Sequence, residues 1–118
     1  TGIDLFAPAI GNIHGMLKGR SDPALDIDRI KLLREAGDVP LVLHGASGNT
    51  DDDIRRAIAA GIAIIHINTE IRVAYRDALK LALQENPEEV APYKILKPAV
   101  QAIERVVSQK LKLFNHVN

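Results

Sequence analysis

The sequence predicts an α/β fold with a parallel sheet, namely the last three strand–helix units of an eight-stranded (β/α)8 TIM barrel and its terminal helices. Short apolar runs alternate with segments of helical periodicity three times along the 118 residues, an order typical of parallel sheets. Three parallel strands alone would leave two unpaired edges, whereas a closed barrel has none but needs about 250 residues. We therefore interpret residues 1–118 as the carboxyl-terminal part of a single barrel domain.

Each predicted unit begins with an apolar run and continues through a turn into a helix. The expected strands are residues 5–10, 39–43 and 62–68. Asp26 and Thr50 are good N-cap residues, and Gly37 and Gly61 stand where the helices that follow them should stop. The third helix should begin at Thr69.

The carboxyl-terminal region is predicted to hold one further helix. Asn86 and Pro87 should end the preceding helix, and a polar connection should follow from Pro92 to Pro98. Because proline is well tolerated in a first helical turn, we expect the last helix to begin at Pro98. Its outer face, which carries Glu104, Arg105, Lys110 and Lys112, is expected to be solvated surface.

Composition narrows the classes of function. The chain has 15 acidic and 15 basic residues, a balance that argues against nucleic acid or an anionic membrane as a partner. Without cysteine, a metal would have to be bound by histidine and carboxylate side chains. The apolar run from Ile62 to Ile67 is much shorter than the ~20 residues of a membrane span. We therefore expect a cytoplasmic protein.

A histidine follows each of the first two predicted strands. His44 precedes a glycine-rich turn containing Gly45, Ser47 and Gly48, and a helix begins just after this turn. Backbone amides in such a turn can surround an anion, and the Ser47 hydroxyl adds a donor. In a barrel these loops share the catalytic face, and the loops after the last two strands commonly bind phosphate. The pattern therefore predicts a metal beside a phosphate site.

Structural roles remain open for several of these residues. A single histidine in apolar surroundings is usually packed and hydrogen-bonded, although two that each close a strand before glycine favour a metal site. His66 lies inside the third predicted strand, so packing, a ligand role and lining of the active site are all open, and we favour lining. Lys18 can be a surface lysine, and both Asn68 and Thr69 are good helix caps. The acidic residues 51–53 are read as favourable charge at a helix start.

Three motifs resemble those of the zinc-dependent, class II fructose-bisphosphate aldolases and their ketose-bisphosphate relatives. They are Ile10-Gly-Asn-Ile-His14-Gly15, Leu43-His44-Gly-Ala-Ser-Gly48 and Asn68-Thr69-Glu70. The resemblance implies that His14 and His44 bind zinc or another divalent metal, while a third histidine and the acid/base aspartate lie upstream. It also implies that the phosphate of dihydroxyacetone phosphate is held by Gly15, Lys18, Gly45, Ser47 and Thr69. His66 stands where the family usually has a substrate-contacting asparagine, and Asn68 occupies the next inward position.

The resemblance implies a metal-dependent aldolase of carbohydrate metabolism, with glycolytic cleavage of fructose 1,6-bisphosphate as the default reaction. Its products would be dihydroxyacetone phosphate and glyceraldehyde 3-phosphate, formed through a zinc-stabilised enediolate. The alternatives are the same chemistry on tagatose bisphosphate or another ketose bisphosphate, and a catalytically silent segment for sugar-phosphate binding or assembly. The expected partners are the missing amino-terminal part of the barrel and a second copy in a homo-oligomer. No catalytic acid or base is expected within these 118 residues.

Overall fold

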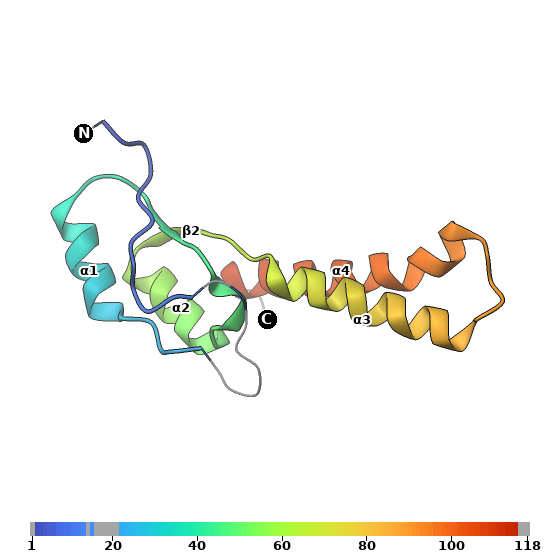
Figure 1. Cartoon of the computed structure of the whole chain (residues 1–118). Helices are drawn as coiled ribbons and strands as arrows, with labels where there is room; N and C mark the ends of the chain where they lie inside the picture. The colour runs from blue at the N-terminus through green and yellow to red at the C-terminus, as the bar shows by residue number, and fades with distance from the viewer. Residues whose placement is uncertain (1, 14, 16–21, 116–118) are drawn as a thin grey trace. The chain divides into compact units, whose positions relative to one another are not determined.

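The computed structural model describes residues 2–13, 15 and 22–115, which contain four α-helices and two parallel strands. The chain divides into two units, Thr1–Asn68 and Thr69–Asn118. In chain order the elements are α1 (Ile27–Ala36), β1 (Leu41–Leu43), the short 3₁₀ helix η1 (Ala46–Gly48), α2 (Asp51–Ala60), β2 (Ile62–Ile65), α3 (Thr69–Glu85) and α4 (Pro92–Phe114) (Figure 1). The predicted α/β class is confirmed.

The sheet of the first unit is built around β1. β2 lies parallel to it, with Leu41 opposite Ile62 and Leu43 opposite Ile65. On the other edge of β1 the chain around Phe6 runs parallel as well: its N–H donates to the Pro40 carbonyl at 3.1 Å and its carbonyl accepts from the Val42 N–H at 2.8 Å. The three apolar runs therefore lie side by side in chain order, as consecutive strands of a parallel sheet would.

Two of the predicted strands are shorter in the structure than in the sequence analysis. Within residues 5–10 only Phe6 forms a bridge, because Pro8 has no N–H to donate to a ladder. β2 ends at Ile65, so His66 follows the strand and does not lie inside it. Its backbone N–H still donates to the Leu43 carbonyl at 3.0 Å, which holds the first residue after β2 against the end of β1.

The two helices of the first unit begin where the sequence predicts. The Asp26 carboxylate accepts from the N–H of Arg29 at 2.9 Å, and the Thr50 hydroxyl accepts from the N–H of Asp53 at 3.1 Å. The same hydroxyl donates to the Asp53 carboxylate at 2.9 Å, so this acidic side chain supports the helix start. Gly61 ends α2 with a left-handed backbone.

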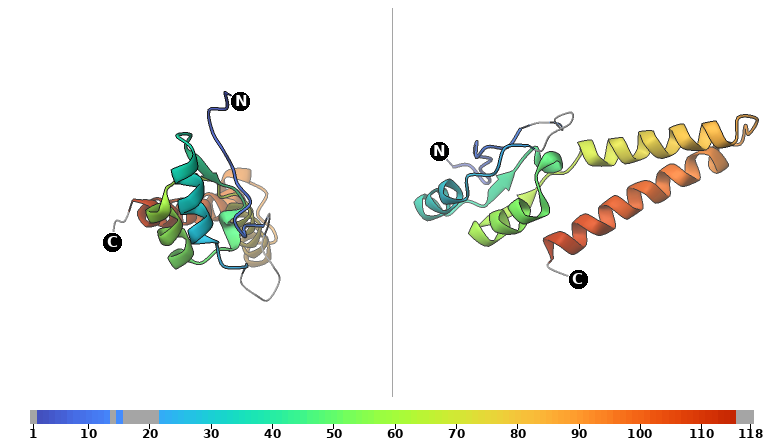
Figure 2. Two further views of the ribbon diagram at one scale, coloured as in Figure 1. Left: turned by 90° about the vertical axis from the view of Figure 1, so that its left-hand side faces the viewer. Right: turned by 90° about the horizontal axis from the view of Figure 1, so that it is seen from below.

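The core of the first unit lies between the sheet and its helices. α1 and α2 pack side by side on the same side of the two strands (Figure 2). All three residues of β1 are buried, which confirms that this strand is covered on both faces. The buried apolar side chains of this unit are Ile10, Leu25, Ile30, Leu41, Val42, Leu43, Ala46, Ile54, Ala57 and Ile62.

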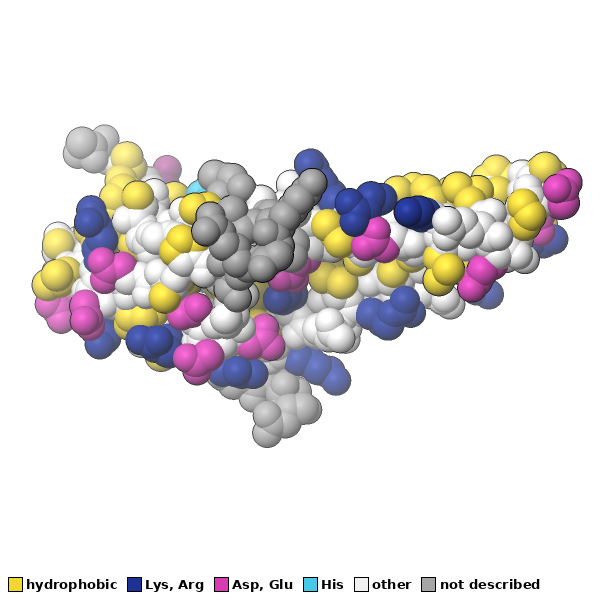
Figure 3. All heavy atoms as spheres, turned by 60° about the horizontal axis from the view of Figure 1, so that its bottom comes forward, with side chains coloured by type: hydrophobic (Ala, Val, Ile, Leu, Met, Phe, Trp, Pro, Cys, Tyr) yellow, Lys and Arg dark blue, Asp and Glu magenta, His cyan; other side chains and the backbone are white. Residues whose placement is uncertain are grey.

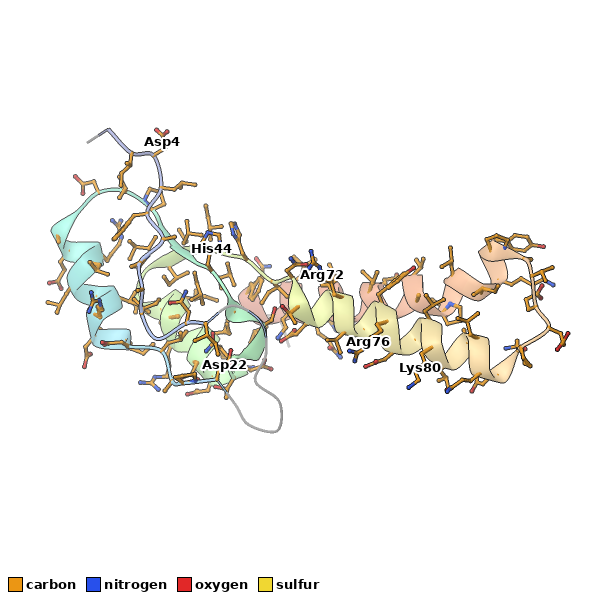
Figure 4. All side chains as sticks on the ribbon, in the orientation of Figure 1. Asp4, Asp22, His44, Arg72, Arg76 and Lys80 are labelled. Atoms are coloured by element: carbon orange, nitrogen blue, oxygen red, sulfur yellow. The ribbon has the colours of Figure 1, made fainter. Side chains whose placement is uncertain are left out.

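The second unit is an antiparallel hairpin of α3 and α4, whose helices run alongside each other in Figure 1 and in the right-hand view of Figure 2. Small buried residues, Ala82 on α3 with Ala99 and Ala102 on α4, let the helices approach closely. Large apolar side chains are also exposed, and hydrophobic residues follow one edge of the hairpin in Figure 3. Arg72, Arg76 and Lys80 succeed one another along α3 in Figure 4.

Two predictions about the last helix were wrong. α4 begins at Pro92, not Pro98, so Pro98 lies inside the helix. Pro92 satisfies the same preference for a first helical turn, and Pro98, inside the helix, lacks the N–H for one backbone hydrogen bond. Lys110 is not solvated surface either, because its side chain is only 16% exposed and its Nζ lies 3.0 Å from the Glu70 carboxylate.

Glu89 organises the connection between the two helices. Its carboxylate lies 2.8 Å from the Lys94 Nζ and accepts from the N–H groups of Val90 and Ala91. The hydrogen bond from Lys94, followed by that from Ala91, lowers the pKa of Glu89 below its ordinary value of 4.5. This contribution to stability is therefore complete above the ordinary pKa and is lost as the pH falls through the lowered one.

Over the described residues, no helix combines the length and apolar character of a membrane crossing.

Candidate metal and phosphate site

His44 lies at the carboxyl end of β1, directly after a strand with all of its residues buried. The imidazole is half-buried, and Figure 4 shows it beside the end of the strands. A buried strand fixes the backbone of the residue that follows it, so the direction of this side chain is set by the sheet. The structure thus places His44 where the sequence predicts a metal ligand, at the strand end that carries the loops.

Asn12 connects the first histidine-bearing loop to this strand end, a role that the sequence analysis missed. Its side-chain Nδ2 donates to the carbonyl of His44 at 2.8 Å, while its Oδ1 accepts from the N–H of Ile10 at 3.0 Å. The loop that leads to His14 is therefore tied to the backbone of His44. The sequence did offer a clue, because an asparagine in a loop commonly forms hydrogen bonds from its side chain to the backbone. This clue did not indicate a partner 32 residues away.

The glycine-rich turn after His44 forms the 3₁₀ helix η1. Gly45 precedes it with φ of 66°, a left-handed conformation that favours glycine. Ser47 is buried, and its Oγ accepts from the backbone N–H of Asn68 at 3.3 Å. This hydrogen bond joins the loop after β1 to the loop after β2. The two loops that the sequence predicts as a phosphate site are therefore adjacent.

The φ of Gly48 is not in the left-handed region, so backbone conformation does not require a glycine here. The requirement comes from packing. A Cβ at this position would overlap with the carboxylate of Asp22, which lies against the glycine. The N–H of Asp22 donates to the Gly48 carbonyl at 3.4 Å. Asp22 is buried, and neither carboxylate oxygen has a hydrogen-bond partner in the part of the chain that the structure describes. The turn therefore packs directly on the segment that precedes α1.

His66 and His44 are in direct contact. Their Nδ1 atoms are 3.2 Å apart, and the rings meet edge to face with centroids 4.5 Å apart and planes at 81°. His66 is exposed, and its ring lies beside His44 at the strand ends. Of the three possible roles, this position rules out simple core packing. Lining of the site and metal ligation both remain compatible with it.

The other predicted residues are only partly described. Gly15 has a positive φ of 100°, and among the described residues no atom lies within 4 Å of the place its Cβ would take, whereas His14 and Lys18 lie outside the described residues. Thr69 is the first residue of α3, in the second unit. Over residues 2–13, 15 and 22–115, no group of three or more histidine, cysteine, aspartate or glutamate residues could hold a metal ion.

Comparison with known proteins identifies the family. The family described as fructose-bisphosphate aldolase class-II matches residues 1–118, the whole of this chain. The chain belongs to the class II fructose-bisphosphate aldolase family. This membership confirms the resemblance that the two histidine motifs carry.

Similar members of the family include two bacterial enzymes. The 6-phospho-5-dehydro-2-deoxy-D-gluconate aldolase of Bacillus subtilis is 40% identical over 97% of this chain and 39% of its own length. The D-tagatose-1,6-bisphosphate aldolase subunit GatY of Klebsiella oxytoca is 44% identical over 91% of this chain and 37% of its own. The chain thus spans about 40% of the length of these relatives.

Solved structures of aldolases have the same fold over this segment. The crystal structure of the YdjI aldolase from Escherichia coli K12 superposes with a TM-score of 0.78 and is 41% identical, covering 96% of this chain and 40% of that one. The fructose-bisphosphate aldolase of Campylobacter jejuni, at 20% identity and a TM-score of 0.71, supports the fold alone.

Asn12 offers a test of how the two histidine loops are joined. Replacing it by alanine removes both side-chain hydrogen bonds, so we expect the full-length protein to lose about 1–2 kcal/mol of stability. For a metal held by His14 and His44, as the sequence analysis expects, the affinity should also fall by about tenfold, because a residue that holds a ligand's surroundings in place commonly contributes this much. Urea unfolding and competition with a chromophoric chelator measure the two effects. Unchanged values for both would mean that the bridge holds neither loop.

Proposed function

We propose that this chain forms the carboxyl-terminal part of a (β/α)8 barrel that catalyses metal-dependent aldol cleavage of a ketose bisphosphate, and the reverse condensation. In this proposal residues 1–118 belong to a single barrel domain. His14 and His44 bind a divalent metal, with zinc as the first candidate. Gly15, Lys18, Gly45, Ser47 and Thr69 bind the phosphate of dihydroxyacetone phosphate.

The observation that carries the proposal is the bridge from Asn12 to the backbone of His44. It holds the loop leading to His14 against the residue that closes β1, so two histidine-bearing loops meet at one end of the sheet. The donor set also fits the metal, because neutral imidazole is a common zinc ligand and cysteine is absent. A bound zinc ion would supply Lewis-acid stabilisation of charge on the substrate oxygens.

The chain's own residues would hold and orient the phosphorylated part of the substrate. The left-handed turn at Gly45 and the 3₁₀ helix after it present backbone N–H groups beside His44. Ser47 holds the loop after β2 in place through the Asn68 N–H. Binding at the phosphate is remote from the bond that breaks, so it contributes orientation to the reaction.

The choice of ketose bisphosphate is tested by direct competition. Fructose 1,6-bisphosphate is the default, and tagatose 1,6-bisphosphate is the second candidate because a relative that is 44% identical is named a tagatose-bisphosphate aldolase subunit. Initial rates with equal concentrations of the two substrates would give the ratio of kcat/KM. A ratio above one for fructose bisphosphate supports the default, and a ratio below one supports the tagatose alternative.

The proposal includes partners that cover the exposed apolar residues of both units. They are the amino-terminal part of the barrel and, in a homo-oligomer, a second copy of the protein. Ile3, Leu5 and Phe6 are exposed beside β1, at the sheet edge where a preceding barrel strand would pair. Burial of such residues is the ordinary arrangement in a closed barrel.

Chelation tests the metal dependence of the reaction. The full-length protein should lose cleavage activity when zinc is removed, and should regain it when zinc is restored. The control is the same chelator after saturation with zinc, which should have no effect. Full activity in metal-free protein, verified by elemental analysis, would overturn the metal mechanism. If the full-length protein binds a phosphate ester but does not turn it over, the result would favour the alternative of a catalytically silent segment that binds sugar phosphates.

A further inference from the structure

We propose that His66 is an additional ligand of the metal that His44 binds, and that it coordinates through Nδ1. This inference rests on the proposed function, since it concerns the same metal. The inference goes beyond the proposed function because it assigns a ligand from the loop after β2. The sequence analysis favours lining of the active site for this residue. With the three histidines that the resemblance implies, His66 would be a fourth ligand, so substrate oxygens would bind by displacing it or at a fifth position on the metal.

The separation of the two rings fits a shared metal ion. Zinc binds histidine nitrogen at ~2.0–2.1 Å with tetrahedral geometry, so two nitrogen ligands of one ion lie ~3.3 Å apart. The Nδ1 atoms of His44 and His66 are 3.2 Å apart. Their rings meet at 81° with centroids 4.5 Å apart. The centroids are therefore farther apart than the facing nitrogens, as expected when both rings approach one point from different directions.

The backbone on both sides of His66 is fixed by the sheet and the turn. The N–H of His66 donates to the Leu43 carbonyl at 3.0 Å, and two residues later the N–H of Asn68 donates to the Ser47 Oγ. Leu43 and Ser47 flank the His44 loop on either side. The imidazole of His66 is thus presented from a backbone that is held to the same segment as its partner, which is the preorganisation that a metal ligand needs.

The positions of the ring protons distinguish shared metal ligation from a hydrogen bond between the two histidines. Without a metal, Nδ1 atoms at this distance require one ring to donate and the other to accept a hydrogen bond, which makes His66 a positioning residue for His44. With a shared metal, both Nδ1 atoms are unprotonated acceptors and each ring carries its proton on Nε2. The number of imidazole ligands on the metal distinguishes these two roles.

X-ray absorption at the zinc edge measures that number in the full-length, zinc-loaded protein. In the variant H66N we expect one imidazole fewer than in the native protein. Zinc affinity, from competition with a chromophoric chelator, should fall by about 100-fold or more, since a lost ligand should exceed the ~10–100-fold effect of an outer-shell residue. His66 is exposed, so the substitution should not impair folding, and H66Q serves as a second variant with a longer amide.

The matched control is N12A, which removes a contact to the backbone of His44 without touching its ring. It should lower zinc affinity while leaving the imidazole count unchanged. An unchanged count in both H66N and H66Q would overturn the ligand role, whether or not affinity falls, and would make His66 a positioning residue. Failure of the native protein to bind zinc at all would instead overturn the proposed function, so the two failures are distinguishable.

Discussion

Replacement of His44 by alanine is expected to reduce aldol cleavage by the full-length protein by roughly 10³-fold or more. Lewis-acid stabilisation by a metal supplies several kcal/mol, and each ~1.4 kcal/mol corresponds to a tenfold change in rate. Because His44 is half-buried and sits after β1 rather than in the core, most of the loss should come from the metal and little from the fold. Steady-state kinetics together with zinc content measure both.

The comparison for His44 is K31A on α1. Lys31 and its ion-pair partner Asp28 are largely exposed, so this substitution should leave both activity and zinc content near the native values. If H44A retains native zinc content and native kcat, His44 is not a ligand. If it retains zinc but loses activity, the imidazole acts on substrate rather than on the metal.

The substitution G48A should destabilise the protein by about 1–3 kcal/mol, because overpacking of a half-buried position in close contact with a neighbour forces that neighbour to move. A Cβ on residue 48 would overlap with the Asp22 carboxylate, which is itself buried. Displacement of this turn should also move Ser47 away from the Asn68 N–H, so we expect a higher KM for the phosphorylated substrate. The urea midpoint and KM are the two measurements.

A double variant shows whether the overlap is the cause. D22A removes the carboxylate that meets the new Cβ, so the combination of D22A with G48A should recover most of the stability that G48A loses. The coupling between the two sites should be about 1 kcal/mol or more, as found for residues in contact. Additive effects of D22A and G48A would contradict the steric explanation and point to the glycine backbone instead.

The sequence predicted best those features that depend on local preferences. Thr50 caps α2 and Asp26 caps α1 because their side chains bond to N–H groups only three residues away. The start at Pro92 was missed because two prolines, six residues apart, offer the same local preference. Local preference therefore does not choose between them, and the structure shows the earlier start.

The candidate site was predicted in its parts but not in its connections. His44, Gly45 and Ser47 follow from a buried strand and a glycine-rich turn, and family membership agrees with both histidine motifs. Asn12 was missed because its partner is the backbone carbonyl of residue 44, and a backbone acceptor leaves no signature in a sequence. Placement of His66 inside a strand was wrong by one residue, and this shift takes it from the sheet to the strand end.

By itself the sequence determined the class of fold and the helix caps of the first unit, and it indicated the residue types of the candidate metal and phosphate site, because each depends on short-range chemistry. The tertiary structure alone decided that His66 meets His44, that Asn12 joins the His44 loop to the preceding one, and that Lys110 pairs with Glu70. These contacts join residues between 22 and 40 positions apart. Pairing over such distances is set by the register of the strands and the packing of the helices, which the order of residues does not state directly.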